Sequence, residues 1–306
     1  MAKLPTSPYS DDQSEGPTRR LAVAKTFKLY VGGAFPRSES GRSIAVLGPN
    51  GESLGHACKA SRKDLRDAVG AARKAQPGWA GATAYNRGQV LYRMAEMVEG
   101  KADELAGLLA LDPARGTTGV DPYTEVTMSV DRLVAFAGWA DKYAQICGRQ
   151  NAVAGPYWNI SVPQPTGVVG VVCPAELPLL ALVSLVAPPV CAGNATVVLS
   201  PAFAPVVSVL GEALATSDLP GGVINLLTGE LDELVPVLAK HRDVDAIHSG
   251  PVSADLARIL REGTADNLKR VAIRKAPAWL DATACQGPGW IEDFVETKTV
   301  WHPVGA

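Results

Sequence analysis

The sequence lacks features that would indicate an extracellular, membrane or nucleic-acid-binding protein. Its five cysteines form no CxxC pair, which argues against a disulfide framework or a zinc cluster. Lys and Arg number 29 against 31 for Asp and Glu, so a net charge of -2 gives no electrostatic reason to expect nucleic acid or a membrane surface. Residues 1–26 contain no apolar segment of signal-peptide length. We therefore expect a cytoplasmic protein with a polar N-terminal tail over 1–26 and no metal site.

A long uninterrupted apolar run is also missing. The most apolar stretch, 167–199, is broken by four prolines and by Glu176 and Asn194. This stretch predicts a strand, a helix and a second strand inside a buried sheet, not a membrane-spanning helix.

The first half of the chain predicts short strands followed by helices. Residues 28–58 read as strands separated by turns, with Pro49-Asn50-Gly51 as a hairpin signal. Ser61 is a candidate N-cap for the first helix. Apolar residues at steps of three or four then predict a second helix over about 84–109 and a third between 125 and 143.

The second half alternates β-branched runs with apolar helical segments. The runs are GVVGVVC, ATVVLS, GGVINLLTG, DVDAIHS and LKRVAIR. This alternation predicts a parallel α/β sheet with crossover helices. Because such sheets bind ligands beyond the carboxyl ends of their strands, we expect a site in the loops after Cys173, Leu199, Thr228 and Ile247.

The order of seven segments over about 28–275 resembles the aldehyde dehydrogenase superfamily. The segments are KLYVGGAF, AVGAARKAQPGWA, NRGQVLYRMAEMVE, PTGVVGVVCPAELPLL, GNATVVLSP, SDLPGGVINLLTG and NLKRVAI. WADKY, HRDVDAI and TKTVWHPVG further resemble the noncatalytic C-terminal module of family sixteen aldehyde dehydrogenases. The resemblance implies a Rossmann-like open parallel sheet over 27–275, an N-terminal helical region, and a hairpin near 157–168 that pairs subunits.

The resemblance also implies a mechanism, and the chain departs from it at two positions. In the family a cysteine thiolate attacks the aldehyde, an asparagine amide holds the oxyanion, hydride passes to NAD or NADP, and a glutamate activates water. Glu176 stands at the asparagine position, and a carboxylate cannot donate that hydrogen bond. Arg274 stands at the glutamate position, and a guanidinium cannot act as a general base.

The cofactor positions implied by the resemblance are degenerate. Pro174 keeps its place in the loop after the first sheet strand, but Ser200 replaces the lysine whose ammonium holds the ribose. Ser249 and Gly250 are the remnant of the turn beneath the pyrophosphate. We expect no certain cofactor, with NAD or NADP bound weakly.

The nucleophile and the catalytic domain of the family are not expected here. Cys285 lies eleven residues past Arg274 with the wrong flanking sequence, and Cys173 and Cys191 read as buried apolar residues. The four histidines are scattered and read as surface or capping residues.

The C-terminal tail, 276–306, contains Trp279, Trp290 and Trp301. Either it folds back on the sheet or it is an interface strand that binds a partner, and we favour the second reading. Arg274 and Lys275 then face a partner or solvent.

Three functional hypotheses follow. The first is a catalytically inactive aldehyde dehydrogenase superfamily protein that acts as a structural or regulatory subunit, paired with itself or with a full-length aldehyde dehydrogenase. The second is an NAD(P)-binding oxidoreductase component whose partner supplies the catalytic cysteine. The third is a truncated remnant without function, which would aggregate when expressed alone.

Overall fold

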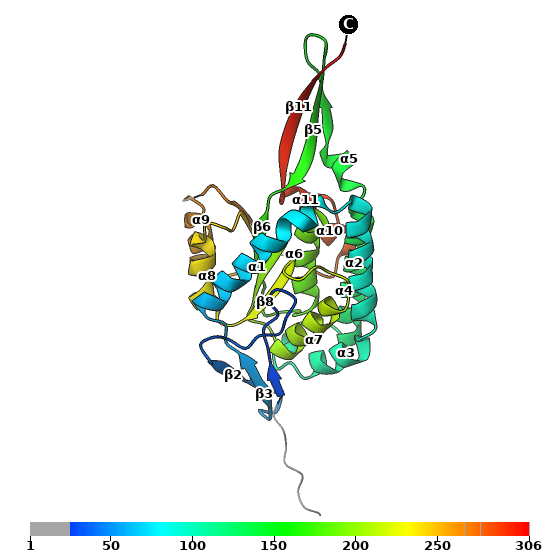
Figure 1. The fold of residues 1–306 in the computed structure, drawn as a ribbon. Coiled ribbons are helices and arrows are strands. Elements are labelled where there is room, and N and C mark those ends of the chain that lie inside the picture. The colour runs from blue at the N-terminus through cyan, green and yellow to red at the C-terminus, as the bar shows by residue number, and fades with distance from the viewer. Residues whose placement is uncertain (1–24, 266, 276, 306) are drawn as a thin grey trace, which may run out of the picture.

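The computed structural model describes residues 25–265, 267–275 and 277–305 as an elongated α/β molecule with a projecting arm (Figure 1). Most of the expected tail therefore lies outside the described residues. Its last two residues do not belong to a tail, because Lys25 and Thr26 form part of a strand that pairs with residues 55–57.

The entry region is a three-stranded sheet. It consists of β1 (Lys25–Phe27), β2 (Ser43–Leu47) and β3 (Ser53–Cys58), in the order β1-β3-β2. β2 and β3 are antiparallel, and Gly51 between them has φ +80°, which glycine adopts without steric cost. The predicted hairpin is confirmed.

Helices follow as the apolar spacing predicted, with one difference. They are α1 (Arg62–Gly81), α2 (Ala84–Glu99), α3 (Ala102–Ala110), the 3₁₀ turn η1 (Arg115–Thr117), α4 (Pro122–Trp139) and α5 (Tyr143–Cys147). The single helix expected over 84–109 is two helices, because Gly100 ends α2 and Lys101 leaves helical geometry before α3 begins.

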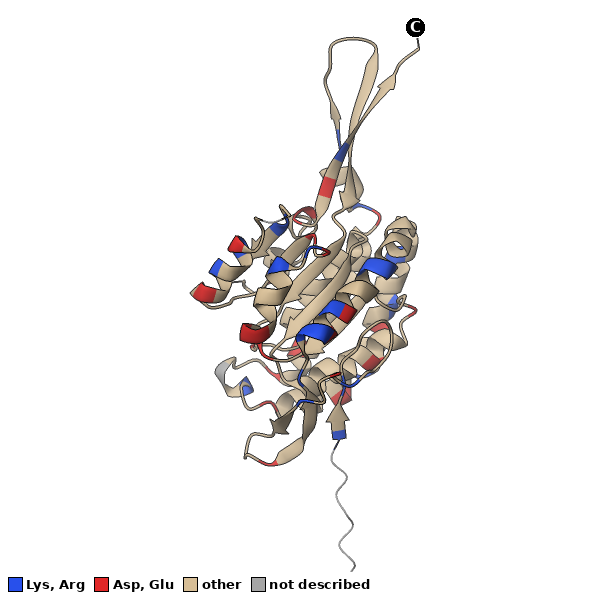
Figure 2. Ribbon diagram, turned by 60° about the vertical axis from the view of Figure 1, so that its left-hand side comes forward, with Lys and Arg blue, Asp and Glu red and all other residues tan. Residues whose placement is uncertain are grey.

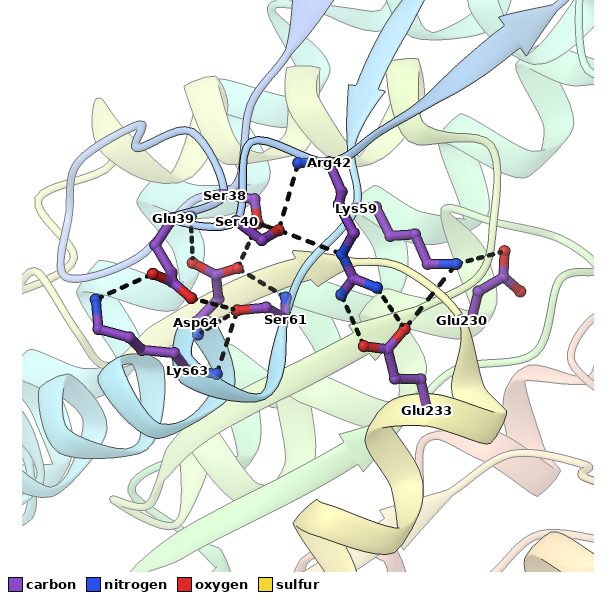
Figure 3. A network of polar contacts seen from close by, with 10 residues as sticks. All are labelled: Ser38, Glu39, Ser40, Arg42, Lys59, Ser61, Lys63, Asp64, Glu230 and Glu233. Carbon is purple, nitrogen blue, oxygen red and sulfur yellow. Dashed lines mark hydrogen bonds and ion pairs between the residues drawn. The ribbon is translucent and has the colours of Figure 1, made fainter.

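Polar contacts fasten the entry region to the first helix and to a later one (Figure 3). Ser61 caps α1 as predicted, in a reciprocal capping box with Asp64. The Asp64 carboxylate also accepts a hydrogen bond of 2.7 Å from Ser38. Arg42 forms a two-pronged ion pair with Glu233 of α8 (Leu231–Lys240), with its shorter contact at 2.7 Å. The entry hairpin is thus held beside the carboxyl edge of the central sheet.

The central sheet is parallel, as predicted, with the order β10-β9-β6-β7-β8. Its strands are β6 (Val168–Val172), β7 (Ala195–Ser200), β8 (Ile224–Thr228), β9 (Ala246–Ser249) and β10 (Arg270–Ile273). The crossover helices are α6 (Leu180–Cys191), α7 (Ala204–Ala215), α8 and α9 (Ala254–Glu262). The apolar stretch 167–199 therefore folds as strand, helix and strand.

The two faces of the sheet carry separate cores. Alternate residues of β6 point to opposite sides: Val169 and Val171 pack with α2, α4, α6 and α7, whereas Val168 and Val172 pack with α1 and α8. Gly222, at φ +97°, turns the chain from α7 into β8, a conformation that glycine adopts without steric cost. Among the described residues, no helix is long and apolar enough to cross a membrane.

The arm consists of β4 (Arg149–Asn151), β5 (Tyr157–Pro165) and β11 (Val295–Pro303), in the order β11-β5-β4. The hairpin expected near 157–168 was placed too late in the sequence. Its two strands are β4 and β5, and residues 157–165 form one of them. The chain then enters the central sheet as β6, in which every residue from Val168 to Val172 is buried.

Candidate functional site

The carboxyl ends of β6, β7, β9 and β10 meet at one edge of the central sheet, which brings together the positions singled out from the sequence. The loops after β6 and β9 touch directly. A Cβ added to Gly250 would lie 2.7 Å from Pro174 Cδ, so only glycine fits at that position. Pro174 and Gly250 are thus neighbours, as a shared site requires.

Glu176, in the loop after β6, is exposed. Its nearest recorded partner is the indole Nε1 of Trp279, at 3.5 Å from Glu176 Oε1, which is the limit of a hydrogen bond. The carboxylate can only accept hydrogen bonds when ionised. The side chain therefore offers an acceptor at the place where oxyanion stabilisation needs a donor.

Ser200 and Ser249 are buried, and both hydroxyls are used locally. Ser200 Oγ accepts a hydrogen bond from Ala202 N at 3.3 Å. Ser249 Oγ donates to Gly250 O at 2.9 Å. Helix α9 begins only after Ser253, whose hydroxyl caps Leu256 N, so the remnant turn at Ser249-Gly250 does not itself open the helix.

Arg274, directly after β10, is only partly exposed and makes contacts within the chain, so it is not the freely solvated residue that the sequence allowed. Its Nη2 donates to Asp293 Oδ2 at 2.6 Å, and its Nε donates to His248 Nε2 at 3.1 Å. The guanidinium also stacks 4.2 Å from the ring centroid of Trp290. Lys275 is exposed, as expected. The C-terminal segment therefore covers Arg274.

His248 is a fully buried residue of β9, not the surface or capping residue that the sequence suggested. Its Nδ1 lies 2.8 Å from Leu185 O. That carbonyl is free because the residue four positions later, Pro189, has no N–H to donate within α6. Burial first, and then the Arg274 charge, hold the pKa of His248 well below its usual range. A neutral imidazole that donates from Nδ1 and accepts at Nε2 satisfies both contacts.

Residues 278–295 fold back onto the helices of the chain itself, and Trp279, Cys285, Trp290, Ile291, Phe294 and Val295 join the core. Two short helices, α10 (Ala282–Cys285) and α11 (Gly289–Glu292), precede β11. Fully buried Arg132 donates to Trp279 O at 2.9 Å and to Cys285 O at 3.4 Å. The core therefore does not end at residue 275. Residues 278–295 fold back on the molecule, whereas residues 296–303 pair with β5 in the arm, and the partner-binding reading of 276–306 stays a prediction.

The three cysteines weighed from the sequence, Cys173, Cys191 and Cys285, show no activated thiol. Cys173 and Cys191 are buried, and burial raises the pKa of both. Burial also raises the pKa of Cys285, and its thiol donates to Ala278 O at 3.3 Å. A catalytic thiolate needs the opposite shift. In the described part of the chain, no three metal-ligating side chains lie together.

Comparison with known proteins settles the family. Residues 35–274 match the aldehyde dehydrogenase family. The chain belongs to the aldehyde dehydrogenase family. It is 32% identical over 266 residues to a putative aldehyde dehydrogenase DhaS of Bacillus subtilis, covering 84% of this chain and 52% of that protein. It is 32% identical over 264 residues to human retinal dehydrogenase 2, with 84% and 50% covered.

Solved structures share the fold. PnpE from Pseudomonas sp. WBC-3 superposes with a TM-score of 0.74 at 29% identity, over 81% of this chain and 50% of that one. Betaine aldehyde dehydrogenase from Staphylococcus aureus, in complex with NAD+, superposes with a TM-score of 0.74 at 25% identity, over 81% and 50%. The chain thus spans about half the length of the relatives it matches.

Within this aldehyde dehydrogenase fold, sequence reasoning located Glu176, Ser200, Ser249, Gly250 and Arg274 at the carboxyl edge of the sheet. It missed His248 and the acidic partner of Arg274, which is Asp293. One signal was available: Arg274 precedes a tryptophan-rich segment that includes Trp290, and a guanidinium is attracted to the face of a tryptophan ring.

Proposed function

We propose that this chain is a catalytically inactive aldehyde dehydrogenase family protein that serves as a structural or regulatory subunit. The observation that carries the proposal is the anchoring of Arg274. A general base belongs at this position in the family mechanism, and here a permanently charged guanidinium is engaged by Asp293, His248 and Trp290. Restoring a base there would require displacing the chain's own C-terminal segment.

Glu176 supports the same proposal from a different loop. An exposed carboxylate at the oxyanion position repels the charge that develops during acyl transfer. Burial raises the pKa of Cys173, Cys191 and Cys285, which disfavours the thiolate that a nucleophile needs. Each of the three roles in the reaction thus meets an obstacle of its own.

The arm supports a role in assembly. Figure 1 shows it projecting from the body, and in Figure 2 its distal part carries no charged residue. One face presents the exposed apolar side chains of Trp158, Ile160, Val162 and Val300, with Ile160 and Val300 directly paired across the strands. An exposed apolar surface of this kind on a separate element favours association with another protein. The proposed partner is a second copy or a full-length aldehyde dehydrogenase.

Two measurements test this proposal. The purified chain is incubated with an aldehyde panel and NAD or NADP, and we expect no reduced cofactor above the protein-free blank. The tagged chain is also recovered from its own cells and analysed by mass spectrometry and light scattering. A defined oligomer, with itself or with a full-length aldehyde dehydrogenase at fixed stoichiometry, is expected. Steady aldehyde oxidation by the isolated chain would sink the proposal.

A second candidate function is an NAD(P)-binding oxidoreductase component whose partner supplies the cysteine. It is favoured by a cleft of about 400 Å³ over the carboxyl ends of β7 and β8, lined in part by Pro201, Phe203 and Thr228. The NAD+ complex of the related betaine aldehyde dehydrogenase adds support. Calorimetry with NAD and NADP decides: saturable binding at micromolar cofactor favours this function, and no binding at millimolar cofactor removes it.

A further inference from the structure

A second cleft, of about 610 Å³, lies between the loop after β6 and the beginning of the C-terminal segment. Thr118 and Val120 form one side, Glu176 and Leu177 another, and residues 277–281 the third. The volume falls within the range that small-molecule sites occupy. The following inference rests on the proposed function, because it assumes that Glu176 no longer serves aldehyde chemistry.

The side chains that line this cleft include two carboxylates, Glu176 and Asp281, and no cation. Asp281 is already engaged: it caps α10 through Ala284 N at 3.1 Å, and its charge acts on buried Arg132. Glu176 is exposed and forms no ion pair with any residue that the structure describes. Apart from the long contact with Trp279 Nε1 at 3.5 Å, its carboxylate is therefore available to a ligand's charge.

The nearest buried cations do not compete for Glu176. Arg115 donates to Glu125 Oε2 at 2.6 Å and to the carbonyl of Val120 at 2.7 Å, behind the wall of the cleft. Arg132 donates to Trp279 O at 2.9 Å and to Ser184 Oγ at 2.7 Å. Both guanidinium groups thus direct their donors into the protein.

The rest of the lining is apolar and shaped by an unusual backbone. Its aliphatic surface comes from Val120, Leu177, Pro277 and Leu280, and Leu280 is 49% exposed. Leu177, the residue after Glu176, has φ +47°, a conformation that a leucine rarely adopts and that costs of order 1–3 kcal/mol. Such residues cluster at ligand sites, where the surrounding structure maintains them.

We propose that this cleft binds a small organic ammonium ion with an apolar tail. The ammonium group lies against the Glu176 carboxylate, and the tail lies along Leu177, Leu280 and Val120. A neutral ligand would leave Glu176 without a counter-charge, and a carboxylate would be repelled by it. The class of ligand is therefore opposite in charge to the oxyanion that this loop stabilises in the family mechanism.

The test is calorimetry of the whole chain with three probes of equal carbon number: n-hexylammonium, n-hexanol and n-hexanoate. We expect saturable binding of hexylammonium that is at least tenfold tighter than that of hexanol, because a hydrogen bond to a charged group contributes about 1.5–3 kcal/mol. Glu176→Gln should abolish this preference. Glu99→Gln, on the exposed end of α2, is the matched control and should retain it.

Each other outcome overturns the inference. Equal affinity for hexanol, or an unchanged preference in Glu176→Gln, would mean an apolar cleft without charge recognition. Tighter binding of hexanoate than of hexylammonium would assign the site to an anion. The absence of binding heat with hexylammonium would mean that the cleft does not bind organic ammonium ions. Aldehyde oxidation by the isolated chain is a separate result: it sinks the proposed function whatever the ammonium titration gives.

Discussion

The two halves of the sheet's carboxyl edge have diverged in opposite ways. At β9 and β10 the edge is closed, because Arg274 binds Asp293 and stacks on Trp290 while His248 lies beneath it. At β6, β7 and β8 the edge stays open, with clefts of about 610 and 400 Å³ beside its loops. The chain's own C-terminal segment thus closes one half of this edge, whereas the other half stays accessible through its two clefts.

The largest expected loss of stability follows from removing Glu125, which holds the start of α6 beside the open half. Glu125 is fully buried, and its Oε1 accepts hydrogen bonds from Leu179 N at 2.9 Å and Leu180 N at 3.2 Å, where α6 begins after the β6 loop. Glu125→Ala removes these contacts and leaves Arg115 as a buried unpaired cation. We expect the free energy of unfolding to fall by about 4 kcal/mol in urea titrations. A loss below 1 kcal/mol would mean that water replaces the carboxylate.

A smaller decrease in the free energy of unfolding is expected when the contacts of Arg274 in the closed half are removed. Arg274→Ala removes the partner of Asp293, and because the Arg274 side chain is 22% exposed we expect a loss of about 2–3 kcal/mol. The matched control is Arg270→Ala, which breaks the more exposed pair with Glu296 and should cost less than 1 kcal/mol. Equal losses in the two variants would contradict the anchoring role of Arg274.

The smallest effect is a pH dependence that arises mainly in the closed half. Since the folded pKa of His248 is lowered by burial and by Arg274, the unfolded chain binds the extra proton. The stability is therefore complete above about pH 6.5 and falls as the pH drops below it, by up to about 1.4 kcal/mol per pH unit.

Urea titrations between pH 7.5 and 5 measure this slope. His248→Gln should flatten it, whereas His241→Gln should remove only a minor part, because the pKa of that half-exposed residue is lowered by a less complete burial. A slope that survives His248→Gln would assign the dependence to other groups.

Local patterns in the sequence were sufficient for most of the fold. Ser61 predicted the start of α1, and the β-branched runs predicted the strands of the central sheet in their parallel arrangement. The position of the arm was not predictable to the residue. A short connection joins β5 and β6, and both strands contain β-branched residues, with aromatic residues in β5 as well. Periodicity does not show where one sheet ends and the next begins.

The residues of the candidate site were found by resemblance, but their surroundings were not. The contact between Arg274 and His248 depends on pairing β10 beside β9, and the contact with Leu185 O depends on Pro189 freeing a carbonyl in α6. Asp293 and Trp290 enter through the fold of the C-terminal segment. Such contacts arise from tertiary packing, which the local pattern of one sequence does not specify.

The pairing of β5 with β11 has a consequence for synthesis. Ser161 and Thr299, which hydrogen-bond across these strands, are 138 positions apart. At roughly 5–20 residues per second, a ribosome needs on the order of ten seconds to make the intervening chain. During that interval the edge of β5 that later pairs with β11 is unpaired, and Trp158 is exposed to other nascent chains. We therefore expect the chain to depend most on chaperones before β11 is synthesised.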